Sequence, residues 1–396
     1  MKLPRASLPI ALASAVSLGA QVLFSLVMLR LFAPHAVGEF SVISQIAFFW
    51  MTLALAQSPL KLLADVHRPA AQALRAALHG SLLRWVLLLP LAWLGVYMSA
   101  LEQAFQLLGW AALLALLQLG WYLAQPLTLR AGSTRSTGLG RALPPLVALV
   151  VAGSLGTAWP NSGSTNLLLA AASGYAVGAL WLMQAYNFPD AAAVKADTAR
   201  VPTQADDRSA LLRVVHTGAD ALTGVALVLV WQRSHGATEA GYLAVLLRVL
   251  GFVPTMIHAA WAQVLLAQGT RRHVSPLWIA LGGAVATAAL GLICVFALQM
   301  QWLAASWTGL APYVLPLVLW QSAACLLAAC SHLPFQRRRA RAFSLAAIGF
   351  DALQLTVLCA PLALGLALDP TAHAWWVCAA SAVGLLALSA MLLRLK

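Results

Sequence analysis

Three ionisable side chains, Asp220, Arg248 and Asp351, lie within long apolar stretches of the sequence. A charge in the hydrocarbon interior of a bilayer is costly, so residues of this kind are candidates for function. Arg248 carries a planar guanidinium group that can hold a phosphate through two parallel hydrogen bonds. The same arginine could instead form a structural ion pair with an acid on a neighbouring helix. Its type and position therefore predict either a phosphate-binding site or a buried ion pair.

The two carboxyl groups each have a polar neighbour one helical turn away. His216 lies one turn before Asp220, and Gln354 follows Asp351 on the same helix face. An acid in this setting could exchange a proton or bind sodium. It could equally hydrogen-bond two helices together, and Asp220 could pair with Arg248. The residues themselves favour neither interpretation.

A short pattern occurs in both halves of the chain: RLFAPHAVGEFS begins at Arg30, and RSHGATEAGYLA begins at Arg233. In each, an arginine ends one apolar segment and a glycine opens the next. Arginine at a helix end complements the helix dipole and can reach the lipid head groups, whereas the glycine is expected to let the chain turn tightly into the next helix. The pattern predicts an internal repeat. A shift of 203 residues aligns Arg233 with Arg30, Gly241 with Gly38, and Arg248 with Gln45.

Composition indicates an integral membrane protein. The 396-residue chain is 62% hydrophobic and 9% charged, with a mean hydropathy of +0.84, whereas soluble domains carry about 25% charged residues. The net charge of +13 would suggest nucleic acid in a soluble protein. Lys and Arg also mark the cytoplasmic loops of membrane proteins, so no nucleic-acid partner is expected. The five cysteines have no metal-ligand spacing, and neither a metal site nor a cofactor is expected.

Twelve apolar segments are about long enough to cross a bilayer as helices. The first resembles a signal peptide, but its apolar run continues to Leu31, so we expect an uncleaved first helix. The predicted spans are 8–31, 40–61, 81–100, 106–127, 142–159, 167–186, 211–231, 241–266, 276–299, 311–332, 342–366 and 373–393.

The basic residues give this all-α protein an orientation. With the N-terminus inside, every Lys and Arg except Arg30, Arg233 and Arg248 falls in a cytoplasmic segment, so both termini are predicted to be cytoplasmic. A polar linker at 188–210 separates residues 1–187 from residues 211–396, six predicted spans each. Both halves run from inside to inside, so the predicted lobes are parallel and can face each other across a central cavity.

The sequence resembles a known group of transporters. MLRLFAPHAVGEFSVISQIAFF (residues 28–49) resembles the first hairpin of polysaccharide and oligosaccharide flippases of the MOP superfamily. HGATEAGYLAVLLRVLGFVPTMIHAAWAQVLLAQ (residues 235–268) resembles the equivalent hairpin of their second lobe. The quoted motifs cover two hairpins, whereas span count, orientation and central linker extend the resemblance over the whole chain.

The resemblance implies a Wzx-type flippase in a bacterial inner membrane. Such a protein turns undecaprenyl-diphosphate-linked oligosaccharide repeat units of O-antigen or exopolysaccharide from the cytoplasmic to the periplasmic leaflet. The implied fold is a V of two six-helix bundles with a cationic cavity and ion-coupled alternating access. Implied partners are the lipid-linked substrate, membrane lipids and other membrane proteins of polysaccharide assembly. The lipid II flippases of the superfamily have two further spans, and its multidrug branch carries acidic residues in the N-terminal lobe that predicted spans one to six lack.

Within this resemblance, the sequence predicts roles for six residues. Arg248, Arg30, Arg233 and Gln45 are the candidates for substrate binding, although Arg30 and Arg233 could simply anchor helix ends at the interface. Asp220 and Asp351 are the candidates for ion coupling. Trp121 and Trp231 are the aromatic residues considered for stacking on sugar, and His332 is expected to be solvated. The alternative function is a multidrug or small-molecule cation antiporter.

No enzyme is expected. The sequence has no H-E-x-x-H, P-loop or G-x-S-x-G pattern. The predicted external loops are short, which argues against a membrane glycosyltransferase or polymerase with a large extracytoplasmic catalytic loop.

Overall fold

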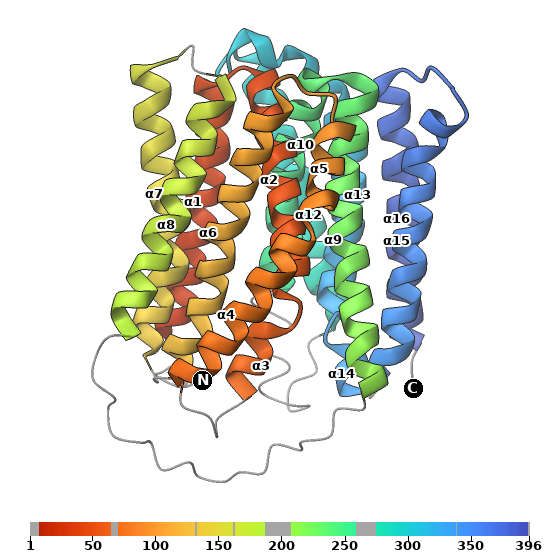
Figure 1. Cartoon of the computed structure of the whole chain (residues 1–396). Coiled ribbons are helices and arrows are strands. Elements are labelled where there is room, and N and C mark those ends of the chain that lie inside the picture. Colours follow the sequence, from red (N-terminus) through yellow and green to blue (C-terminus); the bar gives the residue numbers. More distant parts are fainter. Residues whose placement is uncertain are drawn as a thin grey trace. The chain divides into compact units, whose positions relative to one another are not determined.

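The computed structural model describes residues 8–64, 70–130, 133–160, 163–186, 207–258, 275–337 and 339–394, which contain helices and no strand (Figure 1). The helices of the first half are α1 (Leu8–Leu31), α2 (Pro34–Leu55), α3 (Ser58–Ala64), α4 (Ala70–Leu87), α5 (Leu89–Met98), α6 (Ala104–Arg130), α7 (Thr134–Ala158) and α8 (Gly163–Tyr186). Those of the second half are α9 (Asp207–His235), α10 (Ala237–Ile257), α12 (Pro276–Gln299), the 3₁₀ helix η3 (Ala305–Leu310), α13 (Ala311–Cys330), α14 (Leu333–Gln336), α15 (Ala340–Ala363) and α16 (Pro370–Arg394).

The membrane spans agree with the sequence prediction. Among the described residues, 11 helices are long and apolar enough to cross a bilayer, and the pair α4–α5 makes up to 12 if it is one span. That pair bends by 45°. Pro90 lies in the first turn of α5, where its missing N–H interrupts the helical hydrogen bonds and explains the bend. Each predicted span overlaps one of these helices or the bent pair, so the all-helical multi-span fold is confirmed, while the cytoplasmic placement of the termini stays a prediction.

Several helices begin earlier than predicted. Helix α2 begins at Pro34 rather than at residue 40, because proline is favoured in the first turn of a helix. Helix α10 begins at Ala237 rather than at residue 241, directly after Gly236, which has a positive φ of 89°. Helix α4 begins at Ala70 rather than at residue 81. Residues 259–266 of the predicted eighth span lie outside the described residues.

Two compact units make up the chain. Unit 1 comprises Met1–Val27 and Val42–Val214, and within it α8 packs against α6 and α7, while α6 also contacts α3 and α4. Unit 2 comprises Met28–Ser41 and Val215–Lys396, and within it α13 packs against α10, α12 and α16, with α15 beside α16. The lobes at 1–187 and 211–396 stay predictions, and most of the linker predicted at 188–210 lies outside the described residues.

In unit 1, a basic side chain caps the C-terminal end of α2. Arg84 of α4 donates from Nε to the carbonyl of Ala54 at 2.7 Å and from Nη2 to that of Leu55 at 3.3 Å. Nη2 also donates to the hydroxyl of Ser58 at 2.8 Å. The last carbonyls of a helix lack intrahelical partners and carry partial negative charge, so a guanidinium satisfies them well.

We therefore expect Arg84→Ala to destabilise unit 1. Hydrogen bonds to a charged group contribute about 2 kcal/mol, and their loss leaves carbonyls unpaired. Thermal unfolding of the purified protein in detergent should show a lower midpoint for Arg84→Ala. The matched control is Arg75→Ala, which removes an exposed arginine from the same helix. Equal midpoints for both variants would contradict the capping role.

Candidate functional site

The repeat is visible as a reciprocal contact between the N-terminal parts of α2 and α10. Gly38 faces the carbonyl oxygen of Ala237, and a Cβ built on it would lie 1.9 Å from that oxygen. Gly241 faces the carbonyl oxygen of Pro34 in the same way, at 2.0 Å. The shift of 203 residues converts one pair into the other. The contact is therefore self-complementary, like the interface of a twofold dimer.

This geometry corrects the role predicted for the two glycines. Neither Gly38 nor Gly241 turns the chain, because both lie within the first turns of their helices. Their missing side chains let two backbones approach closely. Gly236, with its positive φ, makes the turn before α10.

The residues around Gly38 are anchored in unit 2, and we refer to residues 28–41 as the hairpin apex. Arg30 donates from Nη1 to the carbonyl of Trp302 at 2.8 Å. Trp307 is fully buried, and its Nε1 donates to the carbonyl of Phe32 at 3.0 Å. Arg30 is thus an anchor of the hairpin apex, whereas its repeat equivalent Arg233 is exposed in the last turn of α9.

Arg248 also contacts the hairpin apex. It lies seven residues, or about two turns, after Gly241 and is half-buried. Its guanidinium carbon is 5.0 Å from the centre of the Phe40 ring, and Nη1 is 3.9 Å from Sδ of Met28. An aromatic face stabilises a cation by electrostatic attraction. Gln45, the repeat equivalent of Arg248, is half-buried in the part of α2 that belongs to unit 1.

The two predicted carboxylates act on each other electrostatically. Asp220 of α9 and Asp351 of α15 are close enough for their charges to repel. Asp351 is 6% exposed, and within the described part of the chain its Oδ2 has no hydrogen-bond partner. One turn along α15, Gln354 donates from Nε2 to the hydroxyl of Ser381 in α16 at 2.8 Å. A buried carboxylate oxygen without a partner is unfavourable unless a proton or a cation compensates it.

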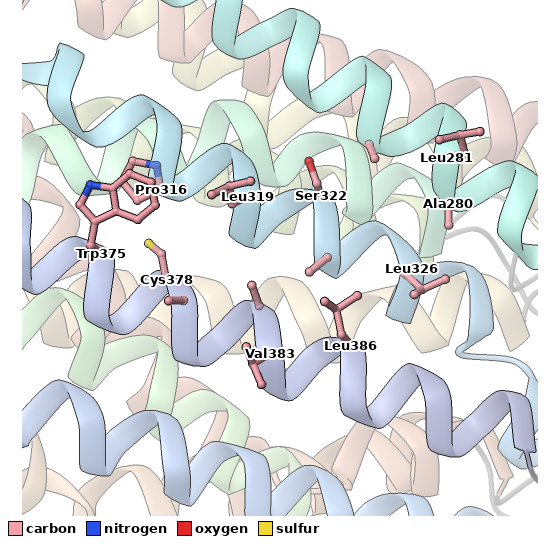
Figure 2. Close-up of a pocket in the computed structure, with 14 residues that line it drawn as sticks. Ala280, Leu281, Pro316, Leu319, Ser322, Leu326, Trp375, Cys378, Val383 and Leu386 are labelled. Atoms are coloured by element: carbon pink, nitrogen blue, oxygen red, sulfur yellow. The ribbon is translucent and has the colours of Figure 1, made fainter.

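A separate cavity of about 540 Å³ lies between α12, α13 and α16 (Figure 2). Trp375 lies at one end and Leu326 toward the other, with Val383 between them. Its walls are almost entirely apolar, with Ser322 contributing one hydroxyl, and none of the six predicted site residues lines it. Such a lining suits a hydrocarbon chain and offers nothing for a diphosphate.

Three minor expectations change. Trp231 is 0% exposed, so it cannot stack on a sugar in this conformation. Trp121 donates from Nε1 to the carbonyl of Gly140 at 2.8 Å, which is a structural use of its indole. The prediction that His332 is solvated is wrong, because that residue is 4% exposed.

The fold defines a class, that of multi-pass α-helical membrane proteins. No protein-family model and no curated protein matches the sequence. Solved structures do match. The chain is similar to the lipid II flippase MurJ in its inward closed conformation, with a TM-score of 0.67 and 10% identity over 96% of this chain and 86% of MurJ.

Two MATE transporters are also similar. An inward-facing multidrug resistance MATE family transporter of the MOP superfamily has a TM-score of 0.54 and 14% identity over 99% of this chain and 93% of its own. The eukaryotic MATE transporter AtDTX14 has a TM-score of 0.53 and 13% identity over 99% and 95%. The chain therefore has the fold of MOP-superfamily transporters, and its structural neighbours are transporters and flippases.

Proposed function

We propose that the chain is a flippase that moves undecaprenyl-diphosphate-linked oligosaccharide repeat units of O-antigen or exopolysaccharide across a bacterial inner membrane. The observation that carries the proposal is Arg248, a half-buried arginine about three turns inside a membrane-spanning helix of this fold. The similarity in fold to a lipid II flippase supports it. The substrate would bind and move by alternating access without any covalent step.

Arg248 would hold the diphosphate. A diphosphate is a multivalent anion, and a guanidinium provides two parallel donors that match its geometry. Phe40 fixes the guanidinium from one side by a cation–π contact. Gln45 would bind sugar or phosphate oxygens, and Arg30 and Arg233 would add positive charge at the ends of their helices. The other partners of the chain would be membrane lipids and further membrane proteins of polysaccharide assembly.

Asp220 and Asp351 would couple this movement to an ion gradient. Their proximity and the unpartnered Oδ2 of Asp351 suit one proton or one monovalent cation. We expect Asp351→Asn to translocate substrate at a rate that no longer responds to an imposed ion gradient, because the amide cannot ionise. The measurement is translocation in liposomes with and without the gradient. Glu102→Gln, at an exposed loop position, is the control. A gradient response retained by Asp351→Asn would contradict the coupling role.

The alternative function is a multidrug or small-molecule cation antiporter. The same carboxylate pair favours it, because acidic groups attract cationic substrates, and two MATE transporters share the fold. The two functions differ in the charge of their substrate, so a single genetic experiment separates them.

That experiment is deletion of the gene in its host. Loss of a flippase should leave undecaprenyl-linked repeat units on the cytoplasmic leaflet and reduce surface glycan. The wild-type gene should restore export, and the Arg248→Gln variant should not. Unchanged surface glycan together with altered drug sensitivity would refute the flippase and support the antiporter.

A further inference from the structure

Two histidines far apart in the sequence share a hydrogen bond in unit 2. His235 is the last residue of α9, and His373 lies in the first turn of α16. Nε2 of His235 is 2.9 Å from Nδ1 of His373. The other ring nitrogen of His373, Nε2, is 3.1 Å from the carbonyl oxygen of Leu358 in α15. His373 is 1% exposed, whereas His235 is half-buried.

These contacts fix where the protons lie in the neutral pair. The carbonyl of Leu358 can only accept, so Nε2 of His373 carries hydrogen and its Nδ1 carries a lone pair. Nε2 of His235 must then donate to that lone pair. The neutral ring of His235 is left with an open acceptor at Nδ1. The hydrogen bonds run in one direction, from His235 through His373 to the backbone.

We propose that the His235–His373 pair is a proton-binding site of this chain. A proton from the surrounding water enters at Nδ1 of His235, and the resulting imidazolium keeps its Nε2–H bond to His373. A second proton, on Nδ1 of His373, would set two N–H groups against each other across 2.9 Å and break the bond. The pair therefore accepts one proton without rearrangement, and a second only if the ends of α9 and α16 separate.

An indole and a carboxylate lie near the pair. Trp231 is fully buried. Its ring stacks on that of His373, with the ring centres 4.7 Å apart and an angle of 23° between the ring planes. The centre of the His235 ring is 4.9 Å from that of Trp231, and the two planes meet at 61°. Indole is the best cation–π partner among side chains. The carboxylate of Asp369, which accepts the N–H of Thr371 and so caps α16, is close enough to act on the charge of His235.

The other charged and titratable groups around the pair are accounted for. On α9, Arg233 is the cation nearest in sequence and is exposed. From α13, Tyr313 packs against Trp231 at 6.2 Å, and its hydroxyl donates to the carboxylate of Glu239 in α10. Glu239 is thus hydrogen-bonded to Tyr313, and the groups whose charges act on His235 are His373 and Asp369.

This site is distinct from the carboxylate pair. His235 follows Asp220 by fifteen residues on α9, which is about 22 Å along the helix at its usual rise of 1.5 Å per residue. The chain would therefore have one titratable site in the middle of α9 and another at its C-terminal end. The inference goes beyond the proposed function, because proton binding by the pair requires no particular substrate.

The direct test is solid-state NMR of the full chain, labelled with ¹⁵N-histidine and reconstituted in liposomes. The signals of the pair are assigned by their loss in His235→Gln and His373→Gln, and exposed His79 serves as the internal reference. At high pH we expect the Nε2–H tautomer at His373. As the pH falls, His235 should become an imidazolium while His373 stays neutral. An Nδ1–H tautomer at His373, or no imidazolium at His235 before the protein unfolds, would overturn the proposal.

A second readout uses Trp231 itself. A protonated imidazole quenches the fluorescence of an adjacent indole, so the difference in emission between wild type and Trp231→Phe should decrease as His235 is protonated. In a His235→Gln background, shown to be folded by its thermal midpoint, this difference should no longer vary with pH. An unchanged pH dependence there would place the protonation elsewhere and contradict the inference. Neither readout involves translocation, so a failure here and a failure of the proposed function are separate results.

Discussion

Replacing Arg248 by Gln is expected to lower translocation of a lipid-diphosphate oligosaccharide by about 100-fold, since two charge-assisted hydrogen bonds of about 1.5 kcal/mol each are lost. Glutamine keeps a polar side chain of similar reach but carries no charge. The guanidinium lies within a membrane span, is half-buried and contacts an aromatic ring. The measurement is the initial rate of translocation by purified protein in liposomes.

Two further variants sharpen this experiment. Arg248→Lys keeps the charge but lacks the planar guanidinium group with its paired donors. Its translocation rate should therefore lie between those of the wild type and Arg248→Gln. Arg135→Gln removes an exposed arginine from α7 and should translocate normally. An Arg248→Gln protein with the wild-type thermal midpoint and the wild-type rate would show that this arginine does not hold the substrate.

The largest expected effect on stability comes from Gly241→Ala and Gly38→Ala. A methyl group at either position would overlap a backbone carbonyl oxygen, because a Cβ built there lies only 2.0 Å (Gly241) or 1.9 Å (Gly38) from it. Relief requires the helices to move apart, because a backbone carbonyl cannot rotate away like a flexible side chain. Overpacking of this kind costs about 1–3 kcal/mol. Alanine favours helix by only about 1 kcal/mol over glycine, which does not offset the clash.

The direction of the change in thermal midpoint distinguishes a clash at the helix crossing from the general effect of replacing a helical glycine by alanine. Gly19 in α1 and Gly282 in α12 have nothing within 4 Å of a built Cβ, so alanine there should raise the thermal midpoint or leave it unchanged. Gly241→Ala and Gly38→Ala should lower it. If all four variants were at least as stable as the wild type, the close crossing of α2 and α10 would be refuted.

The sequence was sufficient to predict the helices but not all of their contacts. Twenty apolar residues crossing a bilayer must form a helix, because no other local structure satisfies the backbone there. That requirement made the spans predictable. The repeat was also predictable from the spacing of Arg30 and Gly38. The use of Gly38 was not, since glycine serves equally at a turn and at a close helix crossing, and only the partner helix decides between them.

In the candidate sites, too, the sequence predicts individual residues but not the contacts between helices. Asp351 was recognised because a carboxyl group in an apolar segment is unusual on its own, but its proximity to Asp220 depends on how α9 and α15 pack. Nothing in the sequence indicates that His235 and His373 form a pair. They are 138 residues apart in the sequence. Their pairing arises from the meeting of α9 and α16, which no local pattern encodes.

The most direct measurement for the proposed flippase is translocation of a fluorescent undecaprenyl-diphosphate oligosaccharide by the purified chain in liposomes, followed by chemical quenching of the label in the outer leaflet. We expect the protected fraction to change at a rate that depends on the protein, is greatly reduced in Arg248→Gln, and is inhibited by unlabelled diphosphate lipid but not by cationic drugs. No acceleration over protein-free liposomes, combined with uptake of a cationic drug by the same preparation, would contradict the flippase assignment.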